Sequence, residues 1–72
     1  MKFYNPIYKR GSEIVENLFI PVDDYYMVSE NGMTYFRERG LINDLRSLLE
    51  DRDLLLAIPQ SNIVMVRVVD ED

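Results

Sequence analysis

The chain contains neither cysteine nor histidine among its 72 residues. Without cysteine it forms no disulfide and offers no thiolate to a metal ion. Without histidine it lacks the side chain that serves most often as a general base and as a metal ligand. Serine–histidine catalysis, cysteine–histidine catalysis and structural zinc sites are therefore excluded.

Long apolar runs and glycine-rich motifs are also missing. The longest apolar run, residues 54–58, is far too short to span a bilayer, and the first ten residues do not resemble a signal peptide. The three glycines match neither the Gly-x-Gly-x-x-Gly pattern nor the P-loop that cradles phosphate. We therefore expect a cytoplasmic protein that forms a single compact domain over residues 1–72 and binds no cofactor.

Carboxylates are the remaining candidates for metal binding and for acid–base chemistry. Asp51 and Asp53 form an Asp-x-Asp pair, and residues 23–24 and 70–72 are acidic clusters. Metal sites of this kind usually need three or more oxygens from different segments, and the twelve-residue calcium-loop pattern is absent. We predict no catalytic residue, no metal site and no enzymatic activity.

The net charge of −5 is unevenly distributed, because residues 11–36 carry five acids and no base. This excess argues against direct binding to nucleic acid and to anionic membranes, both of which require clustered Lys and Arg. It favours a partner protein with a basic surface. The alternative is that the acidity only keeps a small protein soluble.

Residues 24–37 carry the clearest local signal. Two aromatic-rich segments flank Asn31-Gly32, a dipeptide that accepts positive φ at both central positions of a type I′ turn. The turn predicts a hairpin in which Tyr26 faces Arg37 and Val28 faces Tyr35 on one side. On the other side Met27 faces Phe36 and Ser29 faces Thr34.

Residues 38–52 have the leucine spacing of an amphipathic helix. Residues 13–22 are ambiguous between a short helical turn and a strand. Residues 2–9 are expected to be extended, at an edge or with an interruption at Pro6, which has no N–H to donate.

Two further segments, residues 54–58 and 63–69, are predicted to be strands on either side of a turn at 59–62. Residues 63–69 show no polar alternation, which favours a central strand buried on both faces. The predicted fold class is α+β, with a small antiparallel or mixed sheet of four to five strands and one main helix packed on one face.

The function that these observations favour is a small protein-binding module that inhibits or regulates a larger protein, such as one that processes nucleic acid. In size, acidity and lack of catalytic residues the chain resembles the small proteins with which phages and mobile elements block host enzymes, although no motif is shared. The candidate partner-binding residues combine acids with hairpin residues of types that are enriched at interfaces. They are Glu13, Glu16, Asp23, Asp24, Tyr25, Tyr26, Glu30, Tyr35 and Arg37.

Two alternatives stay open. The first is a homo-oligomeric structural protein, in which the strand at 63–69 pairs with a copy of itself if it lies at an edge. The second is a regulator that binds nucleic acid through its aromatic residues. Residues 26–32 resemble the Tyr-x-Val-Ser-x-x-Gly stretch of a DNA-binding module attached to some HNH homing endonucleases, but the flanking tryptophan and basic residues of that module are lacking.

Overall fold

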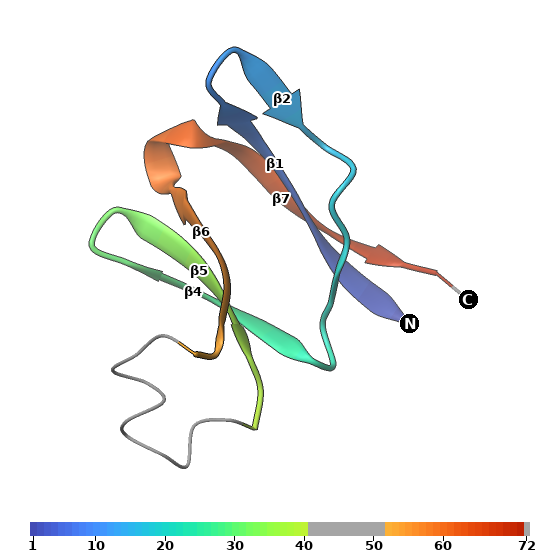
Figure 1. Cartoon of the computed structure of the whole chain (residues 1–72). Coiled ribbons are helices and arrows are strands. Elements are labelled where there is room, and N and C mark those ends of the chain that lie inside the picture. The colour runs from blue at the N-terminus through green and yellow to red at the C-terminus, as the bar shows by residue number, and fades with distance from the viewer. Residues whose placement is uncertain (41–51, 72) are drawn as a thin grey trace.

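The computed structural model describes residues 1–40 and 52–71, and this part of the chain is all-β (Figure 1). Its elements are seven strands and one short 3-10 turn. In chain order they are β1 (Lys2–Arg10), β2 (Glu13–Val15), β3 (Ile20–Pro21), β4 (Tyr25–Glu30), β5 (Met33–Glu38), β6 (Leu54–Pro59), η1 (Gln60–Asn62) and β7 (Ile63–Asp70).

The strands form two antiparallel sheets. In the first sheet β1 is central: β7 pairs along one side of it, while β2 and β3 pair with its two ends on the other side. The second sheet has the order β4-β5-β6. The chain passes from the second sheet to the first through η1, so β6 and β7 lie in different sheets (Figure 1).

Proline in the middle of β1 is tolerated because of where its nitrogen points. Glu71 donates its N–H to the carbonyl of Met1, and Val22 donates its N–H to the carbonyl of Lys2. Since alternate residues of a strand direct their peptide groups to opposite sides, Pro6 shares the side of Lys2 and faces the gap between β2 and β3. The expectation of an edge strand or of an interruption at Pro6 is wrong, because β1 runs unbroken from Lys2 to Arg10 and is central in its sheet.

The hairpin formed by β4 and β5 has the predicted register. Tyr26 pairs with Arg37, Val28 with Tyr35 and Met27 with Phe36, among other pairs. Asn31 and Gly32 have φ of 52° and 78°, the positive values that a type I′ turn requires.

The two sheets pack against each other around a small core. Tyr8 and Ile20 from the first sheet and Phe36 and Ile58 from the second form one buried cluster. The ring of Tyr4 contacts that of Phe36, with 5.6 Å between their centroids. One face of each sheet therefore contributes to the core.

The α+β prediction is wrong, since the described residues contain no helix beyond the 3-10 turn. The predicted helix does not begin at Glu38, which ends β5 and pairs with Tyr25. After it, Gly40 turns the chain with a φ of 88°. Residues 41–51, which hold most of the predicted helix, lie outside the described residues.

The helical turn considered within residues 13–22 is also absent. Instead of forming hydrogen bonds within that segment, the carbonyls of Glu16 and Leu18 accept hydrogen bonds from the side chain of Asn5 at 3.0 and 2.8 Å. The segment is held extended by this contact and by the short strands on either side of it.

The prediction that residues 63–69 form a central strand buried on both faces is wrong as well. They do form a strand, β7, but among the described strands it pairs with β1 alone and lies at the edge of its sheet. Val64, Met65 and Val68 are 55%, 49% and 62% exposed. Polar residues do not alternate along β7 because several of its exposed positions are occupied by apolar side chains.

Candidate partner-binding site

The most deeply buried polar side chain, Asn5, has a structural role. Its amide group donates to the carbonyls of Glu16 and Leu18, and its oxygen accepts two hydrogen bonds from the Arg67 guanidinium at 3.1 and 2.7 Å. Because the amide group is occupied on both sides, Asn5 joins β7 to the segment between β2 and β3. It is not available to a ligand.

Arg37 and Asp53 form a second buried polar pair. A guanidinium nitrogen lies 3.0 Å from the Asp53 carboxylate, and the two side chains are only 15% and 2% exposed. The other carboxylate oxygen of Asp53 is buried without a hydrogen-bond partner in the described part of the chain. Because both side chains are buried, the pair has a structural role. Arg37 is therefore poorly placed to contact a partner protein, as the sequence predicted it would.

The hairpin tyrosines are only partly accessible. Tyr25 packs against the core. Tyr26 and Tyr35 lie on the outer face of the second sheet, where the guanidiniums of Arg39 and Arg37 stack over their rings at 5.8 and 5.1 Å. These stacking contacts use part of the aromatic surface that the sequence assigned to a partner.

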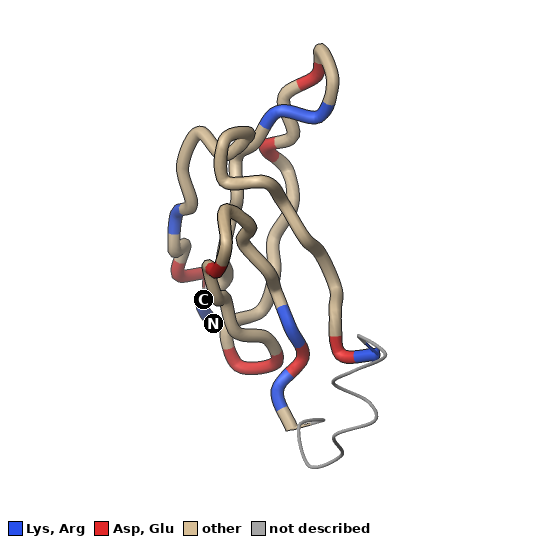
Figure 2. Tube along the Cα trace, turned by 90° about the vertical axis from the view of Figure 1, so that its left-hand side faces the viewer, with Lys and Arg blue, Asp and Glu red and all other residues tan. Residues whose placement is uncertain are grey.

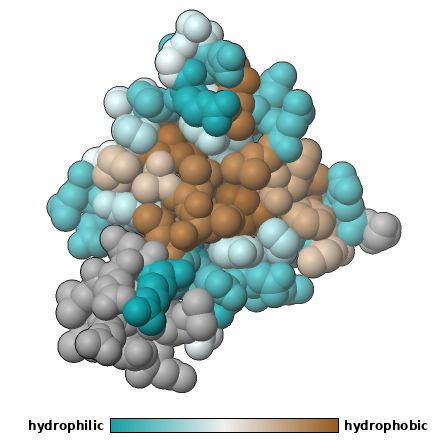
Figure 3. Space-filling model, in the orientation of Figure 1, coloured by the Kyte–Doolittle hydropathy of each residue, from teal (hydrophilic) through white to brown (hydrophobic). Residues whose placement is uncertain are grey.

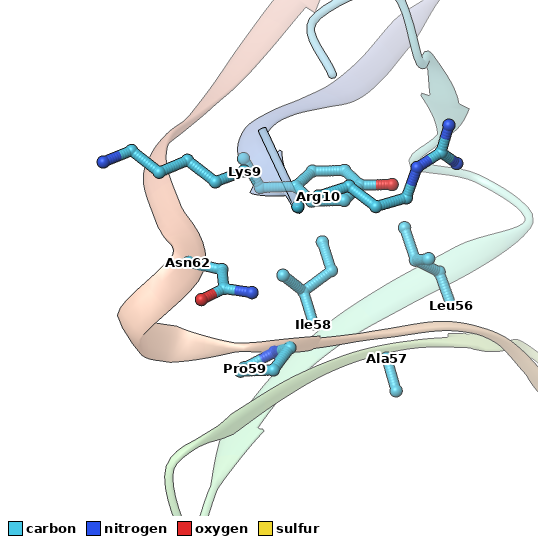
Figure 4. Close-up of a pocket in the computed structure, with 9 residues that line it drawn as sticks. Lys9, Arg10, Leu56, Ala57, Ile58, Pro59 and Asn62 are labelled. Atoms are coloured by element: carbon cyan, nitrogen blue, oxygen red, sulfur yellow. The ribbon is translucent and has the colours of Figure 1, made fainter. Parts of the chain in front are cut away.

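A shallow hollow of about 280 Å³ lies between the end of β1 and the β6–η1 corner (Figure 4). Its floor is apolar and includes Ile58, Leu56 and Pro59, and the Asn62 amide lies at its rim. The side chains of Lys9 and Arg10 point away from it in opposite directions. None of the described residues that line it is a carboxylate, and its volume is below that of ordinary ligand pockets, so this hollow is a weak candidate for a catalytic site.

The five acids predicted as a partner-binding surface do not lie together. Glu13 lies at the β1–β2 hairpin and forms an exposed ion pair with Arg10, at 3.7 Å, and Glu16 follows β2. Glu30 ends β4, roughly 17 Å along the strand from Tyr25 at its start. Asp23 and Asp24 occupy the turn before β4.

The structure instead brings the 23–24 turn to the same end of the molecule as the last residues of β7. Val22 donates to the carbonyl of Lys2, and Lys2 pairs on its other side with Asp70. Two strand spacings, about 10 Å, therefore separate the backbones of Val22 and Asp70. We call the exposed acids Asp23, Asp24, Asp70 and Glu71 the acidic end; in Figure 2 the red 23–24 turn lies below the N and C labels.

An aromatic ring lies beside the acidic end. Phe19 is 45% exposed and contacts Phe3 edge-on, with 6.4 Å between the ring centroids. Phe3 follows Lys2 in β1 and pairs with Pro21, so this ring lies close to the base of the 23–24 turn. Sequence reasoning missed Phe19, Asp70 and Glu71 because only the pairing of the two ends of the chain brings them together.

A separate apolar surface follows β7. Figure 3 shows apolar side chains gathered across the middle of the face drawn in Figure 1, where β1, β6 and β7 lie. Val64, Met65 and Val68 of β7 and Leu55 of β6 are among the exposed large apolar residues. An apolar surface of this kind on a small protein usually marks an interaction site.

Comparison with known proteins found no matching family model, no matching curated protein and no matching solved structure. Among the described residues, no helix is long and apolar enough to cross a membrane. The same residues contain no group of three or more acidic side chains placed to hold a metal ion.

Proposed function

We propose that the protein is a binding module that recognises a basic surface on another protein and thereby inhibits or regulates that protein. The observation that carries this proposal is the exposed ring of Phe19 beside the four carboxylates of the acidic end. An apolar anchor next to charged groups is the usual composition of a protein–protein contact, with the ring contributing affinity and the charges contributing specificity.

The charge balance at this end remains negative. The ammonium group of Met1 lies 3.4 Å from the Asp70 carboxylate, and Lys2 lies between the two acidic segments. A third positive charge, the Arg39 guanidinium, donates to the Val22 carbonyl beside the 23–24 turn. Three positive charges therefore oppose the four carboxylates and leave one net negative charge. The acidic end therefore attracts a cationic surface during encounter, and this attraction falls as salt screens it.

The test begins with affinity capture of a stoichiometric partner from a lysate of the native host, followed by association kinetics. The double variant Asp23→Lys/Asp24→Lys is expected to slow association about tenfold or more at low salt, because it reverses the charge of one acidic segment. Phe19→Ala is expected to accelerate dissociation with little effect on association, because its contact forms after encounter.

The matched control is Glu13→Lys/Glu16→Lys. It changes the net charge by the same amount, but Glu13 begins β2 and Glu16 follows it, and β2 pairs with the end of β1 that lies away from the acidic end. A smaller loss of association rate in the control supports a local site at the acidic end. Equal losses in the two double variants would show that only the overall charge matters and would contradict the proposal.

A further inference from the structure

The open edge of β7 has its own binding chemistry. The N–H and carbonyl of Glu71 are both bonded to Met1, at 2.8 and 2.7 Å. Since peptide groups alternate in direction along a strand, Val69 and Arg67 share the side of Glu71 and face β1, whereas Val66, Val68 and Asp70 direct their peptide groups outward. A strand edge with free peptide groups is a template for another strand.

The side chains along this edge are apolar and incompletely covered. Val66 and Val68 pair with Pro6 and Tyr4, so they lie on the face of the sheet that packs toward the core. Val66 contacts the core, but Val68 is 62% exposed because the second sheet does not cover the edge. A further strand alongside β7 would cover these side chains.

We infer that the strand alongside β7 is β7 of a second copy of the chain, paired antiparallel about a two-fold axis at Val66. This register sets Val68 opposite Val64 of the second copy and Arg67 opposite Met65. A register centred on Arg67 would set two guanidiniums opposite each other, which destabilises a strand pair. The apolar contacts and the absence of facing charges therefore favour the register at Val66 over the register at Arg67.

The distribution of charge also selects a second copy. Residues 63–69 lie within residues 54–69, the longest stretch of the C-terminal half without an acid, in a chain whose net charge is −5. Two copies repel each other elsewhere, but they meet along β7 without opposing carboxylates. Salt screens the remaining repulsion, so self-association is expected to strengthen as salt rises.

The pairing closes at two copies, because a two-fold contact uses the β7 edge of both chains. The first sheets of the two copies join into one continuous sheet. Because the strands run antiparallel, the acidic end of one copy lies at the opposite end of the contact from that of the other. The dimer therefore presents two separated partner-binding surfaces.

The experiment is sedimentation equilibrium on the full chain and on two charge variants. Val64→Lys/Val68→Lys and Val64→Glu/Val68→Glu each place like charges opposite one another across the contact. Each variant alone is expected to weaken self-association about tenfold or more, and an equimolar mixture is expected to restore a one-to-one dimer. The lysine variant also lowers the overall negative charge, which by itself would reduce the repulsion between two copies. A loss of dimer in this variant would therefore report the local contact.

The matched control is Ile14→Lys/Met27→Lys, which substitutes two other exposed apolar strand residues and is expected to leave the dimer intact. Circular dichroism confirms that each variant is folded. A wild-type protein that stays monomeric up to millimolar concentration would overturn the inference, as would a dimer that persists in the lysine variant or a mixture that does not associate. None of these measurements involves the partner protein, so this inference and the proposed function fail independently.

Discussion

Asn5 is the residue whose replacement tests the fold most sharply, because its side chain joins three segments. Asn5→Ala removes the two hydrogen bonds that the amide donates to the carbonyls of Glu16 and Leu18 and the acceptor of the Arg67 guanidinium. A net contribution of about 1 kcal/mol for each of the two donated bonds gives about 2 kcal/mol. Arg67 is largely exposed to solvent, so its contact adds about 1 kcal/mol more.

The expected loss is therefore about 3 kcal/mol out of a total stability of roughly 4–11 kcal/mol for a domain of this length. Urea unfolding followed by circular dichroism measures it. Asn5→Asp keeps the acceptor for Arg67 but places a carboxylate oxygen beside the two carbonyl oxygens, and is expected to lose at least about 2 kcal/mol. Asn17→Ala, an exposed residue in the same segment, is the control and is expected to change stability by less than about 0.5 kcal/mol. A loss below about 1 kcal/mol for Asn5→Ala would refute the reasoning.

Two further substitutions test the core and the buried ion pair by the same unfolding assay. Phe36 is fully buried and contacts Tyr4, so Phe36→Ala is expected to cost about 3–5 kcal/mol and to leave the chain near its unfolding threshold. Arg37→Met leaves the Asp53 carboxylate buried and is expected to cost about 3–5 kcal/mol, while Arg37→Met/Asp53→Leu recovers most of that loss. A double variant no more stable than Arg37→Met would show that the uncompensated charge is not the cause.

The hairpin is the part of the fold that the sequence predicted best. Its register was predictable because a two-residue Asn-Gly turn permits only one antiparallel alignment of its flanking residues, and every predicted pair is present. The strands predicted at 54–58 and 63–69 are present as β6 (Leu54–Pro59) and β7 (Ile63–Asp70), and β-branched and aliphatic residues dominate both.

The fold class was not predictable from local signals. The leucine spacing of residues 38–52 indicates a helix, but residue 38 belongs to β5 and the pattern says nothing about how strands pair. The segment 16–19 pairs with no neighbouring strand, and its conformation depends on hydrogen bonds from Asn5. Asn5 precedes Glu16 by eleven residues and Leu18 by thirteen. Long-range hydrogen bonds of this kind leave no periodicity in a sequence.

The candidate site was predicted only in part. Asp23 and Asp24 were selected from the acidic stretch and remain exposed, whereas Glu13, Glu16 and Glu30 lie elsewhere on the molecule. The acidic tail looked like a solvated terminus because its contact with Met1 spans seventy residues of sequence. The edge position of β7 was not predictable either, because a run of apolar residues is typical of a central strand.

Partner binding and self-association are expected to respond to salt in opposite directions, and this difference is the most direct test of the two proposed surfaces. The measurement is the dissociation constant of the captured partner and that of the self-association, each determined over a range of sodium chloride concentrations. We expect partner binding to weaken and self-association to strengthen as the salt concentration rises. Partner binding that is independent of salt, or self-association that weakens with salt, would contradict this expectation.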